Sequence, residues 1–277
     1  MIARIACLLI FAAGIACAQN YPTRPVRVII DFPAGGPSDS LARLIGQKLT
    51  ESLGQSFVYD NRPGANGVIA YGLAARAPAD GYTLVILSTP FPLNAALRRK
   101  LSYDTAKDFT PVSLVAYYAN VLILHPAVPA RTVAEFVAYA KAKQGGVAYA
   151  SSGTGSVQHL AMELLRRVAG FDAVHVPYAG SAPAVVNLLG GHVQASITTL
   201  PTALPHVRAG RLTALAVLNA ARSIHLPELP TLVESGMPVV AQGWGGIGAP
   251  AGVPRAIVSK LNAEIARIVA QIGRAHV

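Results

Sequence analysis

Short apolar runs alternate with helix-like patterns over the first third of the chain. Val26–Ile30, Phe57–Tyr59 and Thr83–Leu87 are predicted strands, because each is a run of β-branched, aliphatic or aromatic residues bounded by turn residues. Between them, residues 38–53 and 68–77 place apolar side chains three and four positions apart, which is the spacing of an amphipathic helix. This βαβαβ order predicts a parallel sheet with helices on its faces.

The same order restarts in the middle of the chain. A proline-rich stretch, residues 226–238, is then predicted to cross the surface, and a helix at residues 254–270 returns to the first unit. The pattern predicts an α/β fold of two lobes around a cleft, with domain 1 at 19–122 and 221–271 and domain 2 at 123–220. Within domain 2 the predicted strands are 121–124, 147–150, 174–176, 193–197 and 212–218, and the predicted helices are 133–143, 157–168 and 183–189.

Both ends of the chain have features that set them apart from the folded lobes. Residues 1–18 combine an N-terminal positive charge, an apolar stretch and the small-residue pattern Ala16-Cys17-Ala18, and are predicted to be a secretory signal peptide cleaved after Ala18. Cys7 and Cys17 would leave with it, so we expect an exported protein without thiol chemistry; lipidation of Cys17 is the alternative. Residues 272–277 are expected to be a non-native tail, which leaves domain 1 truncated at its C-terminus.

Composition narrows the class of partner. Charged residues make up only 13% of the chain and apolar residues 52%, unlike the composition of disordered or nucleic-acid-wrapping proteins. The formal net charge of +10 favours an anionic ligand only weakly, because lysine and arginine are scattered and form no basic stripe. We therefore expect no nucleic-acid partner.

Three predicted strand-to-helix loops are unusually rich in small residues: Phe32–Asp39, Ser151–Ser156 and Tyr178–Pro183. In open parallel sheets, ligands lie beyond the carboxyl ends of strands, and glycine lets the backbone approach a ligand closely. Unpaired amides at a helix start favour negative charge, and Ser and Thr hydroxyls add donors. An ordinary capped turn explains any one loop equally well, but three loops in two lobes favour binding of an anion. The predicted N-caps of the flanking helices are Ser38 or Asp39, and Ser181 or Ala182.

Enzyme chemistry has less support in the sequence. Gly153-Thr154-Gly155 begins a dinucleotide-binding fingerprint, but no third glycine follows, and no P-loop or nucleophile elbow is present. The 13 carboxylates form no close pair along the sequence, and the seven histidines show no metal-ligand spacing. We expect neither a cofactor nor a metal. His159, near the start of the helix after the second loop, is the histidine placed best to line the cleft.

Motifs along nearly the whole chain are similar to those of one receptor family. Besides the glycine-rich loops, they include Tyr21–Val26, Asn61–Ala65, Lys107–Phe109, Leu229–Thr231 and Ala249–Gly252. In this order the chain resembles the Bug-type periplasmic solute receptors of the tripartite tricarboxylate transporter family. The resemblance implies two Rossmann-like lobes of the type II periplasmic binding protein kind, which close on a small organic carboxylate.

By position, the resemblance assigns ligand contacts in both lobes. Thr198-Thr199 stands where the family commonly has Asp-Asn, which removes an acidic group that could pair with a ligand amine. Pro90–Leu93 replaces a more polar loop, and both departures point to a plain carboxylate rather than an amino acid. The implied ligand-binding residues are Ala34, Gly35, Gly36 and Ser88 in the first lobe, and Ser152, Gly153, Thr154, Ser156, His159, Tyr178 and Gly180 in the second.

The resemblance also implies a role and a partner. We expect a monomer in the periplasm that hands its ligand to a membrane transporter. A sensor that signals to a membrane partner is the first alternative, and an α/β enzyme acting on a small anion is the second. A cleft of glycines and hydroxyls binds but lacks a base or nucleophile, which weighs against the enzyme.

Overall fold

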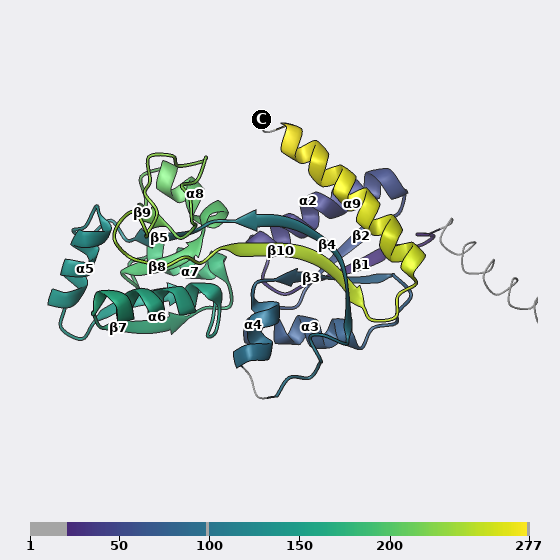
Figure 1. Cartoon of the computed structure of the whole chain (residues 1–277), viewed down its shortest axis with the longest axis horizontal. Coiled ribbons are helices and arrows are strands. Elements are labelled where there is room, and N and C mark those ends of the chain that lie inside the picture. Colours follow the sequence, from purple (N-terminus) through teal and green to yellow (C-terminus); the bar gives the residue numbers. More distant parts are fainter. Residues whose placement is uncertain (1–20, 98–99, 276–277) are drawn as a thin grey trace, which may run out of the picture.

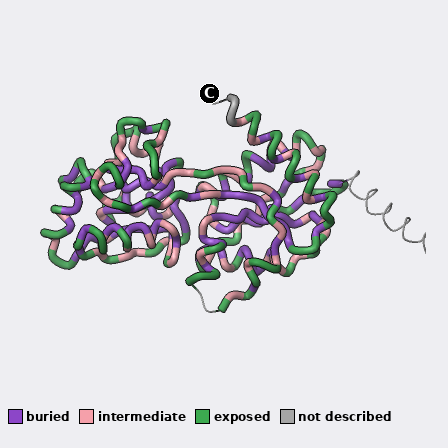
Figure 2. The backbone as a smooth tube through the Cα atoms, in the orientation of Figure 1, coloured by how far each residue is buried: buried purple, intermediate pink, exposed green. Residues whose placement is uncertain are grey.

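The computed structural model describes residues 21–97 and 100–275, which form two α/β lobes side by side (Figure 1). Each lobe is built on a five-stranded sheet, and buried segments run through the middle of both lobes (Figure 2). Within these ranges no helix has both the length and the hydropathy to span a membrane. The predicted signal peptide, residues 1–18, lies outside the described residues.

The sheet of the first lobe has the strand order β2-β1-β3-β10-β4. β1 is parallel to β2 and β3, as the βαβ pattern predicts, whereas β10 runs antiparallel to β3 and β4. α2 and α9 pack on one face of the sheet, and α3 and α4 on the other. The bounds are Val26–Ile30 (β1), Pro37–Leu53 (α2), Phe57–Asn61 (β2), Val68–Ala75 (α3), Thr83–Ser88 (β3), Pro90–Leu97 (α4), Phe109–Tyr118 (β4), Gly243–Pro250 (β10) and Arg255–Ala275 (α9).

The sheet of the second lobe has the strand order β7-β6-β8-β5-β9. β6 is parallel to β7 and β8, and β5 runs antiparallel to β8 and β9. α5 and α6 pack on one face, and α7 and α8 on the other. The bounds are Asn120–Leu124 (β5), Val133–Ala142 (α5), Val147–Ser151 (β6), Val157–Ala169 (α6), Ala173–Pro177 (β7), Ser181–Leu189 (α7), Ala195–Thr199 (β8), Leu200–Arg208 (α8) and Thr213–Val217 (β9).

Two neighbouring stretches of chain connect the lobes. β4 passes into β5 through Ala119, so one continuous stretch leaves the first sheet and enters the second. The chain returns between Ala241, whose carbonyl accepts a hydrogen bond from Asn120 Nδ2 at 2.8 Å, and Gly243 at the start of β10. Gly243 pairs with Tyr118, so the two crossings lie side by side and form the hinge (Figure 1).

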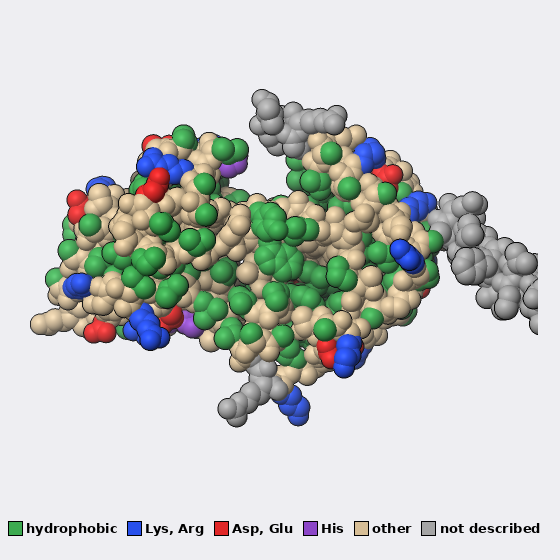
Figure 3. All heavy atoms as spheres, in the orientation of Figure 1, with side chains coloured by type: hydrophobic (Ala, Val, Ile, Leu, Met, Phe, Trp, Pro, Cys, Tyr) green, Lys and Arg blue, Asp and Glu red, His purple; other side chains and the backbone are tan. Residues whose placement is uncertain are grey.

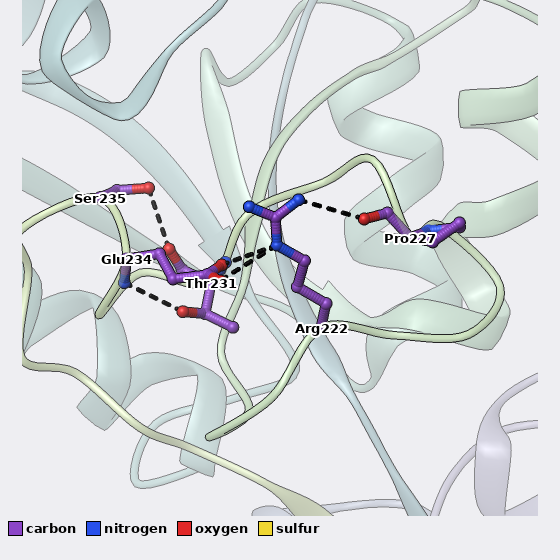
Figure 4. A network of polar contacts seen from close by, with 5 residues as sticks. All are labelled: Arg222, Pro227, Thr231, Glu234 and Ser235. Carbon is purple, nitrogen blue, oxygen red and sulfur yellow. Dashed lines mark hydrogen bonds and ion pairs between the residues drawn. The ribbon is translucent and has the colours of Figure 1, made fainter.

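The long segment between β9 and β10 stays on the second lobe. Arg222 Nε lies 3.1 and 3.0 Å from the two carboxylate oxygens of Glu234 (Figure 4). Thr231 and Glu234 bond reciprocally, with Thr231 N–H donating to the carboxylate at 2.7 Å and Glu234 N–H donating to the Thr231 hydroxyl at 3.0 Å. Leu232 and Val239 are buried in the core of this lobe. These contacts hold the segment against the second sheet.

The lobe boundaries consequently differ from those expected from the sequence pattern. All of β5 belongs to the second sheet, so the first crossing lies at residues 118–120 rather than after 122. Residues 221–240 lie with the second lobe, so the return crossing is at 241–243 rather than at 220. The α/β class and the two-lobe architecture are confirmed.

Several elements were not predicted from the sequence pattern because they contain proline. β4 carries Pro111 and is the edge strand of its sheet, where a missing N–H is tolerated. α4 begins at Pro90 in a stretch expected to be a loop, and α8 contains Pro205 in its interior. α9 continues through residues 272–275 of the predicted tail, while residues 276–277 lie outside the described residues.

Candidate functional site

A cleft between the lobes is lined by the first turns of helices from both sides. α2 and α4 of the first lobe and α6, α7 and α8 of the second each contribute residues at or beside their N-termini. The cleft contains about 450 Å³ free of protein atoms, including the part open to solvent. No charged side chain is among the described residues that line it: Phe32, Pro33, Gly36, Pro37, Ser38, Ser88, Thr89, Pro90, Tyr118, Ser152, Val157, Gln158, Gly180, Ser181, Ala182, Pro183 and Thr199.

Helix N-termini give this uncharged cleft a preference for anions. The first amides of an α-helix have no acceptor within the helix, and the helix dipole places partial positive charge there. Gly36 is the N-cap of α2 and Gly180 the N-cap of α7, so Ser38 and Ser181 lie inside the first turns. The N-caps predicted from the sequence, Ser38 or Asp39 and Ser181 or Ala182, were therefore wrong by one to three positions.

The acidic residue in the first turn of α2 is turned away from the cleft. Asp39 Oδ2 accepts hydrogen bonds from Gly35 N–H at 3.1 Å and Arg43 Nε at 2.9 Å, and Asn61 Nδ2 donates to Oδ1 at 3.1 Å. Burial alone would raise the pKa of Asp39, but these hydrogen bonds outweigh it and hold the pKa below its usual value. The Gly35 amide is thereby occupied, and Ala34 and Gly35 are exposed at the rim.

The charge distribution leaves the cleft to backbone and hydroxyl groups. Lysine and arginine side chains appear as separate groups on the face shown in Figure 3, not as a continuous stripe. In the part of the chain that the structure describes, no cluster of three or more His, Cys, Asp or Glu residues could hold a metal ion.

A chain of hydrogen bonds links the second lobe's wall to the hinge. Ser152 Oγ donates to Gln158 Oε1 at 2.7 Å, and Gln158 Nε2 donates to Asn120 Oδ1 at 3.0 Å. Asn120 in turn donates to the Ala241 carbonyl on the return crossing. Ser152, Gln158 and Asn120 are all buried, so this network connects the cleft wall to both crossings through the protein interior.

The turn between β6 and α6 uses several of its own polar groups to hold its shape. Gly153 N–H donates to Ser151 Oγ at 3.1 Å, and Gly155 N–H donates to His159 Nδ1 at 3.1 Å. Ser156 Oγ accepts from His159 N–H at 3.2 Å and is the N-cap of α6. Ser156 and His159 therefore shape the loop from behind, and neither lines the cleft.

Two stacked imidazoles support this turn. The rings of His159 and His175 lie 3.9 Å apart between centroids, at 19° to each other. His175 Nε2 is 2.6 Å from Ser151 Oγ. Burial lowers the pKa of His159, and burial together with the neighbouring His159 lowers the pKa of His175 to about 4, so both rings are neutral near pH 7.

A second hollow continues from the cleft past Ser152 and Phe32, which line both. It is bounded by Gly153, Thr154 and Tyr178 of the second lobe and by residues 64–66 of the first. The side-chain Nδ2 and Oδ1 of Asn66 are buried here without a hydrogen-bond partner. A buried amide without a hydrogen-bond partner costs about 1–3 kcal/mol of stability. A ligand or a water molecule that hydrogen-bonds to the Asn66 side chain would remove this cost.

The predicted site residues thus fall into groups. Gly36, Ser88, Ser152 and Gly180 line the cleft; Gly153, Thr154 and Tyr178 line the adjoining hollow; Ala34, Gly35, Ser156 and His159 line neither. Other lining residues lie in segments that the sequence had already indicated: Ser38, Ser181 and Ala182 in the glycine-rich loops, Thr89 directly after Ser88, and Thr199 at a departure from the family pattern. Sequence reasoning missed Tyr118 and Gln158 in the cleft and Asn66 in the hollow, of which Gln158 could have been found as a first-turn position of a helix.

Comparison with known proteins agrees with this architecture. The model of the tripartite tricarboxylate transporter family receptor, TctC, matches residues 41–271. Protein BugT of Bordetella pertussis is 41% identical over 264 residues, which cover 93% of this chain and 81% of that protein.

Two solved structures with bound acids have the same fold. A protein of R. palustris with adipate has a TM-score of 0.86 and 41% identity, covering 89% of this chain and 83% of that one. MatC from Rhodopseudomonas palustris with bound malate has a TM-score of 0.84 and 34% identity, covering 90% and 85%. The chain therefore belongs to the TctC family of solute-binding receptors of tripartite tricarboxylate transporters, a family of receptors and not of enzymes.

Proposed function

We propose that this receptor captures a small organic carboxylate in the cleft between its lobes. The observation that carries the proposal is the convergence of helix N-termini from both lobes on a cleft whose described lining holds no charged side chain. Such a site attracts an anion through amides and helix dipoles, without a compensating Lys or Arg. A micromolar ligand needs about −8 kcal/mol, and hydrogen bonds to a charged group contribute about 1.5–3 kcal/mol each, so four to six of them suffice after ordering costs.

The shape of the site favours an acid with an aliphatic body. Phe32, Pro33, Pro90, Val157 and Pro183 supply apolar wall between the polar helix starts. Such walls suit methylene groups, whereas a ligand ammonium would meet no carboxylate there. The adipate and malate in the related structures are both dicarboxylates, which is consistent with this proposal.

We extend the proposal to the position of a second carboxylate. One end of a dicarboxylate lies at the first turns of α2 and α7, and the other reaches the hollow beside Thr154. There Asn66 Nδ2, which has no hydrogen-bond partner, can donate a hydrogen bond to the second carboxylate. Asn66 also approaches the opposite lobe, lying 4.0 Å from the place where a Cβ on Gly155 would be.

The cellular role follows from the family. Family members include periplasmic binding proteins, and we propose that residues 1–18 direct export and that the mature monomer delivers its ligand to a membrane transporter. Intact-mass analysis of periplasmic material should give Gln19 as the first residue. A diacylglycerol adduct on Cys17 would instead make the protein a lipoprotein.

The binding proposal is tested by the fluorescence of Trp244, which is the single tryptophan of the chain. Its backbone N–H donates to Thr89 Oγ1 at 3.0 Å, and Thr89 lines the cleft, so occupancy should change the emission. We expect a panel of mono- and dicarboxylates of increasing length to contain a saturating ligand, and the matching amides and amines to give none. A panel in which only amides or cations bind contradicts the proposal.

The second-carboxylate position is tested with Asn66→Ala. The variant should bind dicarboxylates at least tenfold more weakly while its affinity for the monocarboxylate of the same length stays within about twofold. Ser40→Ala, an exposed change on the outer side of the first turn of α2, is the control and should change neither. If the affinities for both ligands fall equally, Asn66 does not bind the second carboxylate.

A further inference from the structure

A fully buried carboxylate lies directly beneath the cleft. Asp31 follows β1 and precedes the first glycine-rich loop, and its side chain is 0% exposed. Tyr71 OH on α3 donates to Asp31 Oδ2 at 2.6 Å, and Ser88 Oγ at the end of β3 donates to the same oxygen. Asp31 was not predicted as a site residue, because a single acidic residue at a strand end looks like part of an ordinary surface turn.

Among the residues that the structure describes, no cation shifts the pKa of Asp31. Oδ1 is buried without a hydrogen bond of standard geometry, although Ser38 and a backbone amide lie close enough to favour the carboxylate. The titratable neighbours are the phenols of Tyr71 on α3 and Tyr118 on β4; burial raises both of their pKa values, so both stay neutral. An ionised Asp31 would be a buried charge that accepts hydrogen bonds from hydroxyls but has no counter-ion among the described residues, and burial disfavours such a charge.

Two of the hydroxyls that approach Asp31 also line the cleft. They belong to Ser38 and Ser88. A hydroxyl has one proton to donate. If Asp31 is ionised, the Ser88 proton is held by Oδ2 and only lone pairs of Ser88 face a ligand. If Asp31 carries a proton, it can donate to the hydroxyl instead, and Ser88 is free to donate to a ligand carboxylate.

We propose that Asp31 is a proton-linked positioning residue: it holds a proton when a carboxylate occupies the cleft, and its protonation state sets whether the Ser88 proton is held by Asp31 or is donated to the ligand. The inference rests on the proposed carboxylate-binding function. Ligand and proton then bind together, because an anion above an ionised Asp31 would add repulsion to a charge that is already buried. Affinity for a carboxylate falls as the pH rises.

The pKa of Asp31 in the ligand-free protein supports the direction of this linkage between proton and ligand binding. Burial is the largest influence and raises the pKa of Asp31, although hydrogen bonds from Ser88, Tyr71 and Ser38 oppose it. Protonated Asp31 therefore stabilises the folded protein. Its contribution to the free energy of unfolding is fully present below the unfolded-state pKa of about 3.9 and is lost as the pH rises through the folded-state pKa.

The test is the affinity of adipate and of malate between pH 6.5 and 9, measured by Trp244 fluorescence. In this window the acids are fully ionised, and the lowered histidine and raised tyrosine pKa values keep His159, His175, Tyr71 and Tyr118 neutral. We expect the wild-type affinity to fall with rising pH, approaching about tenfold per unit above the pKa of the free protein. Asp31→Asn, which is neutral at every pH, should bind with a flat profile and more tightly than wild type at pH 9.

The matched control is Asp60→Asn, at the surface of the same sheet, where the carboxylate is paired with Arg27 and Arg62. It should keep the wild-type pH profile. A flat wild-type profile, an unchanged slope in Asp31→Asn, or a folded Asp31→Asn protein that binds adipate and malate less well at all pH values would each overturn the proposal.

A failure of the carboxylate function itself is distinguished by urea unfolding of the free proteins between pH 5 and 9. If neither acid binds any variant, the proposed function has failed. Asp31 is then still tested, because wild type should lose stability relative to Asp31→Asn as the pH rises. If the difference in the free energy of unfolding between the two proteins is constant across this pH range, Asp31 holds no linked proton.

Discussion

His159 and His175 stack behind the ligand loop in an arrangement that suits neutral imidazoles. Burial lowers both pKa values, and the charged group facing them from α6 is Glu163, which also accepts from Tyr149 OH at 2.7 Å and Arg166 Nε at 2.7 Å. Burial opposes ionisation of Glu163, but these hydrogen bonds hold its pKa below the usual value. The cluster is therefore built for neutral rings and an ionised carboxylate.

We expect this cluster to lose stability in acid. The unfolded histidines take up protons near pH 6.5, whereas His175 resists protonation down to about pH 4. The free energy of unfolding should therefore fall as the pH drops through this interval. Urea unfolding at half-unit steps of pH should show a shallower fall for His175→Gln than for wild type. An equal fall in both proteins, or the same shallowing in the exposed-residue control His192→Gln, would rule out this role.

Single residues are where the sequence was least informative. Gly36, Ser88, Ser152 and Gly180 could be placed in the cleft because glycine-rich loops and helix starts have a recognisable pattern. Asp31 and Asn66 could not, because their significance depends on buried side-chain atoms that lack a hydrogen-bond partner, which no local pattern records. His159 was expected in the cleft, but its ring accepts a hydrogen bond from Gly155 and stacks on His175 instead.

At the level of helices and loops, Gly180 has little space between it and the opposite lobe. It has φ +147°, and a Cβ there would lie 3.0 Å from Pro33 Cδ on the opposite lobe. Gly180→Ala should weaken carboxylate binding by at least tenfold, because it strains the N-cap of α7 and holds the lobes apart. The fluorescence titration described above measures the effect.

Gly170→Ala is the matched control for this prediction. Gly170 is the C-cap of α6 with φ +70°, so the substitution also introduces backbone strain at a positive φ, but nothing lies within 4 Å of its Cβ position. It should lower the unfolding midpoint and leave the affinity within about twofold. If the two variants lose affinity equally, closure at Gly180 is not what limits binding.

The regular elements were largely predictable and the irregular ones were not. Parallel βαβ units follow from continuous apolar strands, periodic helices and the glycines between them. β4, α4 and α8 carry prolines that mark turns in sequence but are accommodated here at a sheet edge, at a helix start or within a short helix. The lobe boundaries depended on side-chain contacts such as Arg222 with Glu234, which only the fold reveals.

In the whole molecule, the hinge and the cleft share one buried network. Gln158→Met keeps the length of the side chain but leaves the amide of Asn120 and the hydroxyl of Ser152 without their partner. Unpaired buried groups cost about 1–3 kcal/mol, so the free energy of unfolding should fall by about this amount and binding should weaken with it. The exposed change Gln47→Met on α2 should alter neither in the same urea and titration experiments. Full stability in Gln158→Met would show that the network does not join the two crossings.

The lobes leave little space between them at two glycines: a Cβ added at Gly180 would lie 3.0 Å from Pro33 Cδ, and one added at Gly155 would lie 3.3 Å from Leu97 Cδ1. A ligand that bridges them adds its own binding energy to the closed form, which is worth about 2.7 kcal/mol of stability at a hundred times the dissociation constant. The central claim is that backbone amides at helix N-termini hold the ligand's negative charge.

The most direct measurement is a crystal structure with the tightest-binding carboxylate of the panel. We expect a carboxylate with its oxygens about 2.7–3.2 Å from backbone nitrogens in the first turns of α2 and α7, and no Lys or Arg side chain in contact with it. A ligand whose charge is paired with a basic side chain, or one bound outside the cleft lined by Gly36, Ser88, Ser152 and Gly180, would contradict this expectation.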